Sequence, residues 1–246
     1  FQVFAGTSIG GLMACALAVG IAPRRVLDAI DANGPQIFEP KPLDKLKQLT
    51  SGAIYDSGKL SAAIRECLGP HASRPIAEVE AALIVPAVNW STGEATIFMS
   101  AALGAMHTSQ ATLHDVCMAS SAAPTFFAPH VLDGSPMLDG GLVANNPDMV
   151  ALHEVTRRWP HAVDRVELLS IGTAGADSLR PPDEAGKGSM EWARKLALFM
   201  IDVQEATAAS QAARFLGSRY LRVNHAPGTA GTCGAAFERL DLASDE

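Results

Sequence analysis

A serine near the start of the chain lies in a spacing that suits nucleophilic catalysis. Ser8 is flanked by Gly6 and Gly10 in the pattern Gly-x-Ser-x-Gly, with Ile9 directly after it. At the apex of a sharp strand-to-helix turn, a serine hydroxyl is lifted clear of the backbone. Glycines on either side remove Cβ atoms that would collide as strand and helix pack closely. The pattern predicts a nucleophile elbow, with the amide dipoles of the following helix aimed at a developing oxyanion.

A serine nucleophile needs a base to take its proton. Asp139 is a better candidate for this base than any histidine of the chain. It ends a short apolar segment, and Gly140 and Gly141 follow it directly, which lets backbone and substrate approach its carboxylate. A carboxylate in water, with a pKa near ~3.9, is a poor base for a hydroxyl, but its basicity rises in a desolvated cleft. A hydrogen bond of ~2.6–3.2 Å to Ser8 Oγ would then permit direct proton transfer. By itself, Asp-Gly-Gly is also typical of a simple turn.

Histidine is the more usual partner of a serine, and the chain contains seven. His114 and His153 fall within helical stretches beside charged residues, where solvated or capping roles are common. His225 follows the last expected strand and is the one position that resembles the late histidine of an α/β-hydrolase triad. A histidine-dependent α/β-hydrolase or acyltransferase therefore stays open as an alternative.

The elements that must position these residues follow from the apolar pattern. Strands are expected at 1–4, 82–88, 95–99, 130–132, 137–138, 166–171 and 220–223. Helices are expected at 12–19, from Pro23 to about 33, and at 60–68, 112–121, 147–159 and 189–216. Residues 35–58 look irregular apart from a helical piece near 43–49, and 174–188 look like a loop. Strands that alternate with helices imply an α/β fold with a mostly parallel sheet covered on both faces.

Composition limits the possible classes of protein. The 246 residues, 48% of them hydrophobic, fit one domain with a large core. A net charge of −7 without runs of Lys or Arg argues against a nucleic-acid partner or a polybasic membrane anchor. Four widely spaced cysteines favour free thiols in a reducing compartment, and the longest apolar stretch, 12–22, is too short to span a bilayer. No spacing of His, Cys or acidic residues suggests a metal.

Three phrases, in their order along the chain, resemble the patatin-like phospholipase family. They are Gly6-Thr7-Ser8-Ile9-Gly10-Gly11, Met118-Ala119-Ser120-Ser121-Ala122-Ala123-Pro124-Thr125-Phe126-Phe127-Ala128-Pro129 and Leu138-Asp139-Gly140-Gly141-Leu142-Val143-Ala144-Asn145-Asn146-Pro147. Segments 37–38, 53–56 and 169–173 also resemble the family's linking regions, so the likeness covers nearly the whole chain.

The resemblance implies a three-layer α/β/α fold with a mostly parallel central sheet. It also implies a serine lipid acyl hydrolase of phospholipase A type, which cleaves fatty-acyl esters of glycerolipids through an acyl-enzyme. Ser8 would be the nucleophile and Asp139 the general base, which disfavours His225. No cofactor is implied. The expected partner is a phospholipid or other acyl lipid, with peripheral membrane contact, in the cytoplasm or on a membrane surface.

One departure from the family concerns the oxyanion hole. The family begins with a strand and a glycine-rich loop of the form Gly-Gly-Gly-x-Arg-Gly, whose amides bind the oxyanion, and residues 1–246 contain no such loop. We therefore expect 1–246 to be a single patatin-like domain that lacks its first strand and oxyanion loop. Since one lost oxyanion donor typically lowers the rate ~10²–10³-fold, catalysis by this chain alone should be impaired. A non-catalytic lipid-binding or storage protein on the same fold is the remaining alternative.

Overall fold

The computed structural model describes residues 2–39, 53–104, 110–173 and 189–224. The helical piece expected near 43–49, the loop 174–188 and His225 lie outside these residues. The strands are β1 Val3–Ala5, β2 Ala82–Asn89, β3 Glu94–Met99, β4 His130–Leu132, β5 Ser135–Asp139, β6 Leu168–Ile171 and β7 Tyr220–Val223. The helices are α1 Ile9–Ala18, α2 Pro23–Ile37, α4 Ser57–Leu68, α5 Leu113–Ser120, α6 Gly141–Ala144, α7 Asp148–Arg158 and α8 Ser189–Leu216, with short 3₁₀ turns between some of them.

The sheet is mixed. In the five-stranded part, β1 pairs with β2 in parallel, while β2 pairs antiparallel with both β3 and β5, and β5 pairs antiparallel with β4. Strands β6 and β7 form a separate parallel pair. The antiparallel pairs β2–β3 and β4–β5 follow from their short connections, which allow only a hairpin. The α/β class is confirmed, and among the described strands the parallel pairs that the sequence favoured are β1–β2 and β6–β7.

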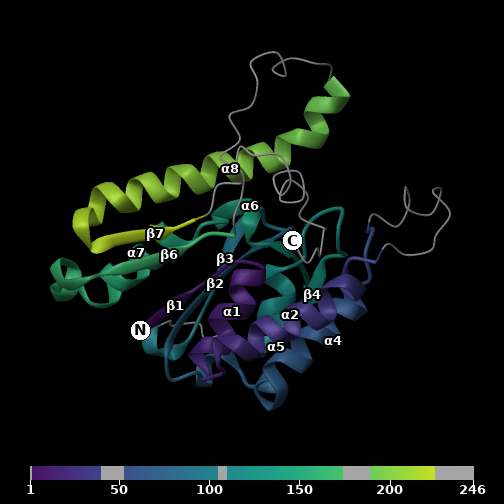
Figure 1. Ribbon diagram of the computed structural model, residues 1–246, viewed down its shortest axis with the longest axis horizontal. Helices are drawn as coiled ribbons and strands as arrows, with labels where there is room; N and C mark the ends of the chain where they lie inside the picture. Colours follow the sequence, from purple (N-terminus) through teal and green to yellow (C-terminus); the bar gives the residue numbers. More distant parts are fainter. Residues whose placement is uncertain (1, 40–52, 105–109, 174–188, 225–246) are drawn as a thin grey trace.

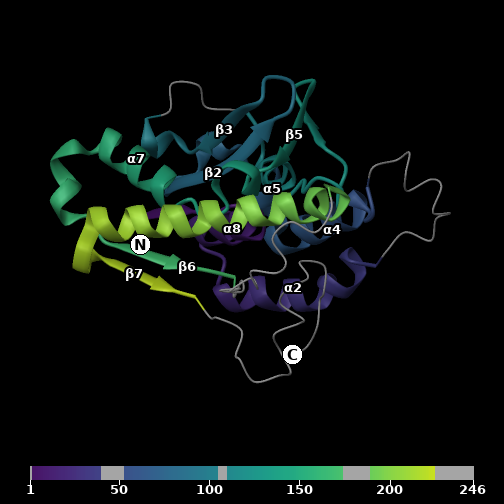
Figure 2. The same ribbon diagram turned by 90° about the horizontal axis from the view of Figure 1, so that it is seen from above.

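Strand β2 lies at the centre of the three layers because both of its faces are buried. Leu83, Val85 and Ala87 belong to the main core, which also contains buried residues of α1, α4 and α5. Ala82 and Ile84 point to the other face, where they pack in a cluster with residues that include Ala151 of α7. Successive side chains of a strand point to opposite faces of the sheet. Since both faces of β2 are apolar, each must be covered, and helices lie on both sides. Figures 1 and 2 show α1, α2, α4 and α5 on one side, and α7 and α8 on the other.

Helix α2 is longer than the sequence indicated. The expectation that it ends near Asn33 is wrong, because the helix continues to Ile37 with Pro35 inside its last turn. There the proline removes a single backbone donor, while the Gly34 carbonyl still accepts the amide of Phe38 at 3.1 Å. Ile37 is buried in a small cluster with Tyr55, and this apolar contact favours the extra turn.

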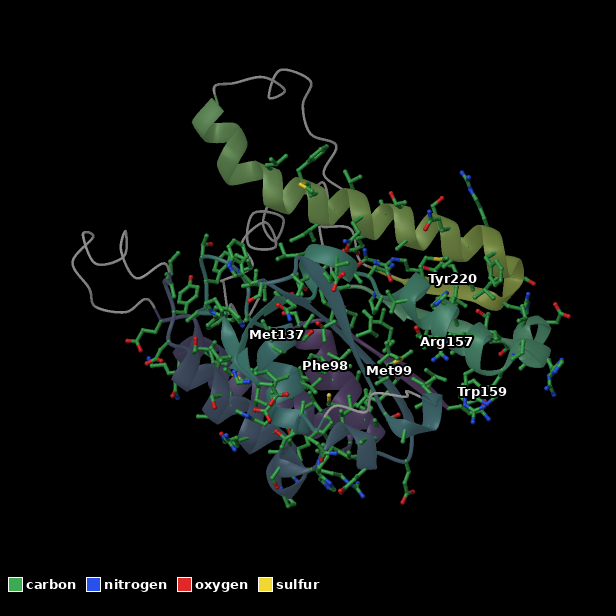
Figure 3. The ribbon with its side chains drawn as sticks, turned by 180° about the vertical axis from the view of Figure 1, so that it is seen from behind. Phe98, Met99, Met137, Arg157, Trp159 and Tyr220 are labelled. Carbon is green, nitrogen blue, oxygen red and sulfur yellow. The ribbon has the colours of Figure 1, made fainter. Side chains whose placement is uncertain are left out.

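The apolar run 166–171 forms a shorter strand with two different faces. Leu168 of β6 and Tyr220 of β7 pack against buried residues of α7 and α8. The Tyr220 hydroxyl, which lies beneath α8 in Figure 3, donates to Asp148 Oδ2 at 2.7 Å. The opposite face carries four exposed apolar side chains, Leu169, Ile171, Leu221 and Val223. Within the described residues this face of the β6–β7 pair has no covering element.

Candidate active site

Ser8 lies at the apex of a tight turn between β1 and α1. The ladder of β1 with β2 continues through the Gly6 amide, which donates to the Ile84 carbonyl at 3.1 Å. The helix begins at once, because the amides of Gly11 and Leu12 donate to the Ser8 carbonyl at 2.9 and 3.2 Å. Ser8 itself has φ 55° and ψ −122°, a conformation that L-residues rarely adopt. This strained turn is the geometry that the Gly-x-Ser-x-Gly spacing predicts.

The two glycines of the motif have different roles. A Cβ added to Gly6 would lie 1.9 Å from the Gly10 carbonyl oxygen, so strand and helix can pack this closely only if residue 6 is glycine. Gly10 is different, since a Cβ there would have no atom within 4 Å. The expectation that Gly10 also prevents a collision is therefore wrong. Its neighbour Gly11 is the second crowded position, with its Cβ site 3.1 Å from Val85 Cγ1 of β2.

Two side chains that sequence reasoning did not single out fix the elbow. Ser120, at the end of α5, accepts the Ser8 amide on its Oγ at 2.9 Å and donates that hydroxyl to the Pro86 carbonyl at 2.7 Å. Thr7 is buried and donates its hydroxyl to the Ala144 carbonyl at 2.5 Å, which ties the elbow to α6. Both residues lie inside the phrases that resemble the family, but no spacing rule assigns a hydrogen bond to either.

Asp139 is the last residue of β5, and its backbone is held by β2 and by the segment at the end of α5. Its backbone lies in register with Ala87 of β2, and its amide donates to the Ala122 carbonyl at 3.0 Å. The next amide, that of Gly140, donates to the Ser120 carbonyl at 3.2 Å. Asp139 itself is only 7% exposed. A nucleophile and a carboxylate that are separated by more than 130 positions in the sequence are therefore brought to the same edge of β2.

The two glycines after Asp139 are needed for close approach. A Cβ on Gly140 would lie 2.2 Å from the Pro86 carbonyl oxygen, which only glycine avoids. Gly141 is less crowded, but its amide donates to Asp139 Oδ1 at 2.6 Å, and a Cβ would lie 3.0 Å from the same oxygen. The prediction that these glycines let the backbone approach the carboxylate agrees with the structure at Gly141, whereas Gly140 lets the chain pass close to the Pro86 backbone of β2.

The Asp139 carboxylate accepts the Gly141 amide at 2.6 Å, and the Ser8 side chain lies near enough to lower the pKa of this carboxyl. Burial raises the pKa of this carboxyl from 3.8 to about 6, and the Gly141 amide and the Ser8 side chain hold the pKa below what burial alone would give. A carboxylate with this pKa is a stronger base than one in water, yet it is ionised at neutral pH. The arrangement can therefore take a proton from the Ser8 hydroxyl.

The start of α1 supplies positive potential beside Ser8. The Ser8 amide is occupied by Ser120, and the amides of Gly11 and Leu12 bond the Ser8 carbonyl. The first two helical amides, those of Ile9 and Gly10, have no intrahelical acceptor because they precede the first complete turn. With the dipole of the helix, these two amides can donate to a negatively charged oxygen beside Ser8.

The described histidines lie apart from this pair. His114 was expected to be solvated or to cap a helix, and this is wrong, because it is 5% exposed and its Nε2 shares a 2.8 Å hydrogen bond with Ser61. Burial, together with the charge of Arg65, lowers the pKa of His114. His130 faces Asp115 at 3.4 Å in the same cluster of α4, α5 and β4. In the part of the chain that the structure describes, no histidine is hydrogen-bonded to Ser8 or Asp139.

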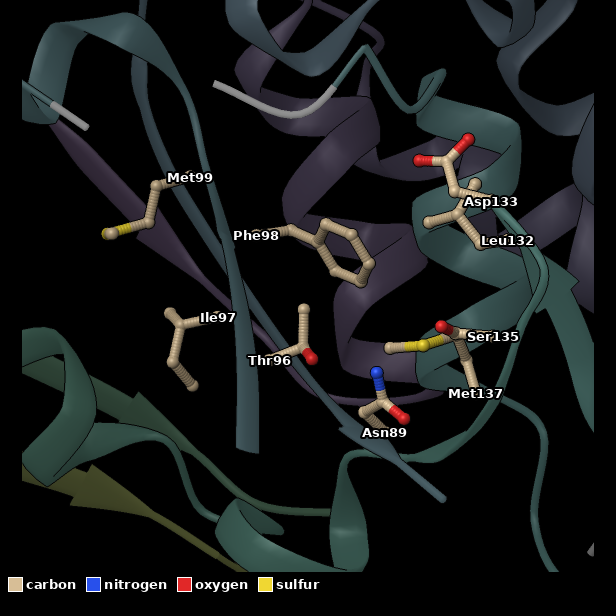
Figure 4. Close-up of a pocket in the computed structure, with 9 residues that line it drawn as sticks. All are labelled: Asn89, Thr96, Ile97, Phe98, Met99, Leu132, Asp133, Ser135 and Met137. Atoms are coloured by element: carbon tan, nitrogen blue, oxygen red, sulfur yellow. The ribbon is translucent and has the colours of Figure 1, made fainter. Parts of the chain in front are cut away.

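A shallow hollow lies on another part of the sheet. Figure 4 shows it between β3 and the β4–β5 hairpin, with Phe98 and Thr96 on one side and Met137 on the other. Its volume is about 240 Å³, and neither Ser8 nor Asp139 lines it. We assign it no role. Among the described residues no cluster of three or more His, Cys, Asp or Glu side chains could hold a metal ion, and no helix is long and apolar enough to cross a membrane.

Comparison with known proteins decides the family. The family model described as patatin-like phospholipase matches residues 1–152, which run from β1 to the first half of α7 and therefore include both Ser8 and Asp139. The chain belongs to the patatin-like phospholipase family.

Patatin-like relatives in bacteria and plants are similar to this chain over most of its length. A cGAMP-activated phospholipase of Vibrio cholerae is 36% identical over 204 residues, which cover 76% of this chain and 57% of the relative. A protein of the same name from Pseudomonas aeruginosa is 30% identical over 91% of this chain and 68% of its own length. Patatin-like protein 1 of Arabidopsis thaliana is 28% identical over 78% of this chain and 53% of its own length. The chain thus spans about half to two thirds of the length of these patatin-like relatives.

Proposed function

We propose that this protein is a serine lipid acyl hydrolase of phospholipase A type, with Ser8 as nucleophile and Asp139 as general base. One observation carries the proposal: the side chain of a strained elbow serine interacts with a buried carboxyl whose pKa is about 6 and lowers that pKa. The names of the similar proteins support a phospholipid as substrate.

In the proposed reaction, Asp139 takes the Ser8 proton as Oγ attacks the ester carbonyl carbon. The tetrahedral intermediate collapses when the C–O bond to the glycerol oxygen breaks, and the proton on Asp139 passes to that oxygen to release the lysolipid. A water molecule then attacks the acyl-enzyme carbonyl while Asp139 takes its proton. The fatty acid leaves when the bond to Ser8 Oγ breaks, and Oγ recovers the proton.

The test is fatty-acid release from phospholipid vesicles by the wild-type protein, Ser8→Ala and Asp139→Asn. Each substitution should lower the rate by at least about 10³-fold. Because two of the relatives are named for activation by cGAMP, the assay is run with and without that compound. Retained turnover in either variant would refute the dyad, and loss of turnover in His225→Asn would favour a histidine base instead. A wild-type protein whose Ser8 is not labelled by a fluorophosphonate would favour a non-catalytic lipid-binding role.

We also propose that a strand and a glycine-rich loop outside residues 1–246 complete this domain. Two features support this. Within the described residues β6 pairs only with β7, so no described strand lies along the other edge of β6. The exposed apolar face of β6–β7, which includes Ile171 and Val223, also needs a cover, because parallel strands are normally buried on both faces. If this proposal holds, a longer chain that includes the upstream coding sequence will be more stable and more active, and equal activity of the two chains would contradict it.

Membrane contact is a further part of the proposal. Apolar side chains that adjoin the pair are exposed: Ile9 and Met13 on α1, and Leu142 and Val143 on α6. Phe127, in contrast, is buried and packs with Tyr55, so it is not available for lipid contact. Replacing Met13 and Val143 by Asp should weaken binding to neutral phosphatidylcholine vesicles, whereas Val131→Asp, at a more exposed apolar position on β4, should not. Unchanged vesicle binding in the double variant would exclude this surface.

A further inference from the structure

Ser120 is hydrogen-bonded to Ser8 and to Gly140, the residue that directly follows Asp139. Its side chain is fully buried and uses both hydrogen-bonding functions of the hydroxyl: Oγ accepts the Ser8 amide at 2.9 Å and donates to the Pro86 carbonyl of β2 at 2.7 Å. The Ser8 amide and the Pro86 carbonyl are both backbone groups. The Ser120 hydroxyl between them therefore fixes the distance of the Ser8 backbone from strand β2.

The backbone of the same residue holds the carboxylate side of the site. The Ser120 carbonyl accepts the Gly140 amide at 3.2 Å, and the Ala122 carbonyl, two residues later, accepts the Asp139 amide at 3.0 Å. The end of α5 therefore carries three hydrogen bonds, one to the nucleophile and two to the segment that bears the base. These segments enter the site from different strands, and α5 is the element that joins them.

The strained conformation of Ser8 explains why such a support is needed. A non-glycine residue at φ 55° and ψ −122° is strained and persists only when its surroundings impose that conformation. Without the Ser120 hydroxyl, the half-buried Ser8 amide would lose its acceptor, and the turn would lose one of the contacts that oppose relaxation. Relaxation of φ and ψ moves Oγ of Ser8, and with it the interaction with Asp139.

We propose that Ser120 is a positioning residue of the acyl-transfer reaction: its buried hydroxyl holds the strained Ser8 elbow at the distance from Asp139 at which the proton can be transferred. The inference rests on the proposed function, since it assigns a role within that same dyad. Ser120 does not touch the substrate carbonyl or the transferred proton. Its effect is carried by the Ser8 amide, which it also keeps from serving as an oxyanion donor.

The chain contains a matched control for this role. Ser100 is as buried as Ser120. Its Oγ accepts the amide of Leu83 in β2 at 3.0 Å and donates to the Ala81 carbonyl at 2.7 Å. Ser100 lies at the opposite end of β2 from Pro86 and Ala87, next to which the dyad forms. Ser100→Ala therefore removes a hydroxyl with the same two bonds and the same burial, but without a link to Ser8.

The experiment compares Ser120→Ala and Ser100→Ala in the protein that releases fatty acid, with thermal unfolding measured for both. We expect similar losses of stability, a kcat about 100-fold lower for Ser120→Ala with little change in KM, and near wild-type kcat for Ser100→Ala. Ser120→Ala should also react more slowly with a fluorophosphonate, which reports the nucleophilicity of Ser8 without a lipid surface. Equal kcat in the two variants overturns the inference. If Ser8→Ala itself retains turnover, the proposed function fails instead.

A second readout separates positioning from general loss of structure. When the Ser8 hydroxyl moves away, Asp139 loses an interaction that lowers its pKa, so the acidic limb of the kcat/KM profile should shift upward from about 6 in Ser120→Ala and stay in place in Ser100→Ala. If Ser120→Ala does not fold, Ser120→Cys keeps the shape of the side chain but offers a weaker acceptor, and should show the same slower labelling and upward shift. Wild-type labelling and an unshifted limb in Ser120→Cys would overturn the role of the hydroxyl.

Discussion

The Gly141 amide donates a 2.6 Å hydrogen bond to Oδ1 of Asp139, the carboxyl whose pKa the Ser8 side chain also lowers. This pairing combines opposite effects on one group. Burial favours the neutral acid, while the Gly141 amide and the Ser8 side chain favour the carboxylate, and burial is the larger effect. The result is a pKa of about 6, which lies close enough to neutral pH for an effective base and low enough for it to be ionised there.

The first prediction concerns the pH dependence of catalysis. Because only the ionised Asp139 can accept the Ser8 proton, kcat/KM should rise as pH increases through about 6 and level off above it. The measurement is hydrolysis of a soluble short-chain ester between pH 4 and 8, which avoids effects of pH on vesicles. A profile that is flat across this window, or whose acidic limb lies near 4, would contradict the role of the buried carboxyl.

The second prediction concerns stability. The folded pKa of Asp139 is raised, so the folded state favours the protonated carboxyl, and this contribution is present below the unfolded pKa of 3.8 and is lost as pH rises through about 6. Asp139→Asn stays neutral at every pH. Relative to the wild type, it should therefore gain stability from pH 4 to pH 8, by no more than about 3 kcal/mol for a shift of about two pKa units.

Urea unfolding of Asp139→Asn and wild type at pH 4 and pH 8 measures this gain. Asp133→Asn is the control, because Asp133 is exposed in the β4–β5 turn, and its effect should be the same at both pH values. An Asp139→Asn variant that is less stable than wild type at pH 8 would show that the hydrogen bonds of the carboxylate outweigh its burial.

The third prediction distinguishes the two glycines of the elbow. Gly6→Ala places a Cβ 1.9 Å from the Gly10 carbonyl oxygen, and strand and helix must separate to accommodate it, so we expect a loss of more than about 3 kcal/mol and no activity. Gly10→Ala meets nothing within 4 Å and lies in α1, where alanine is the better helix former, so it should be neutral or stabilising by up to about 1 kcal/mol. Thermal unfolding of the two variants measures these changes in stability. Comparable losses of stability in both would contradict the prediction, because they would show that a Cβ is not tolerated at either position.

The fourth prediction concerns the link between the elbow and α6. Thr7→Val keeps the shape of the side chain but removes the hydroxyl that donates to the Ala144 carbonyl at 2.5 Å, so the buried carbonyl loses this bond. We expect a loss of about 1–3 kcal/mol, with a lower kcat because α6 begins directly after Gly140. Thr96→Val on β3, a half-buried position without a side-chain hydrogen bond among the described residues, serves as the control. If Thr7→Val and Thr96→Val are equally stable, the Thr7 hydroxyl does not stabilise the elbow.

The sequence alone determined the local geometry of this site. A strand, a turn with φ > 0 at Ser8 and a helix follow from the Gly-x-Ser-x-Gly spacing and its apolar flanks, and the close approach at Gly6 and at Gly140 was readable because only glycine lacks a Cβ. The choice of Asp139 also came from local signals, an apolar segment followed by two glycines. These features depend on a few consecutive residues.

Only the tertiary structure decided how these pieces act on one another. The burial that raises the pKa of Asp139 comes from elements far away in the sequence, and the Ser120 hydroxyl reaches Ser8 across 112 positions. The extension of α2 past Pro35 and the burial of His114 likewise depended on partners from other elements, Tyr55 in the first case and Ser61 in the second. Composition and spacing identify the groups that can react, but desolvation and long-range hydrogen bonds, which set their chemistry, exist only once the chain has packed.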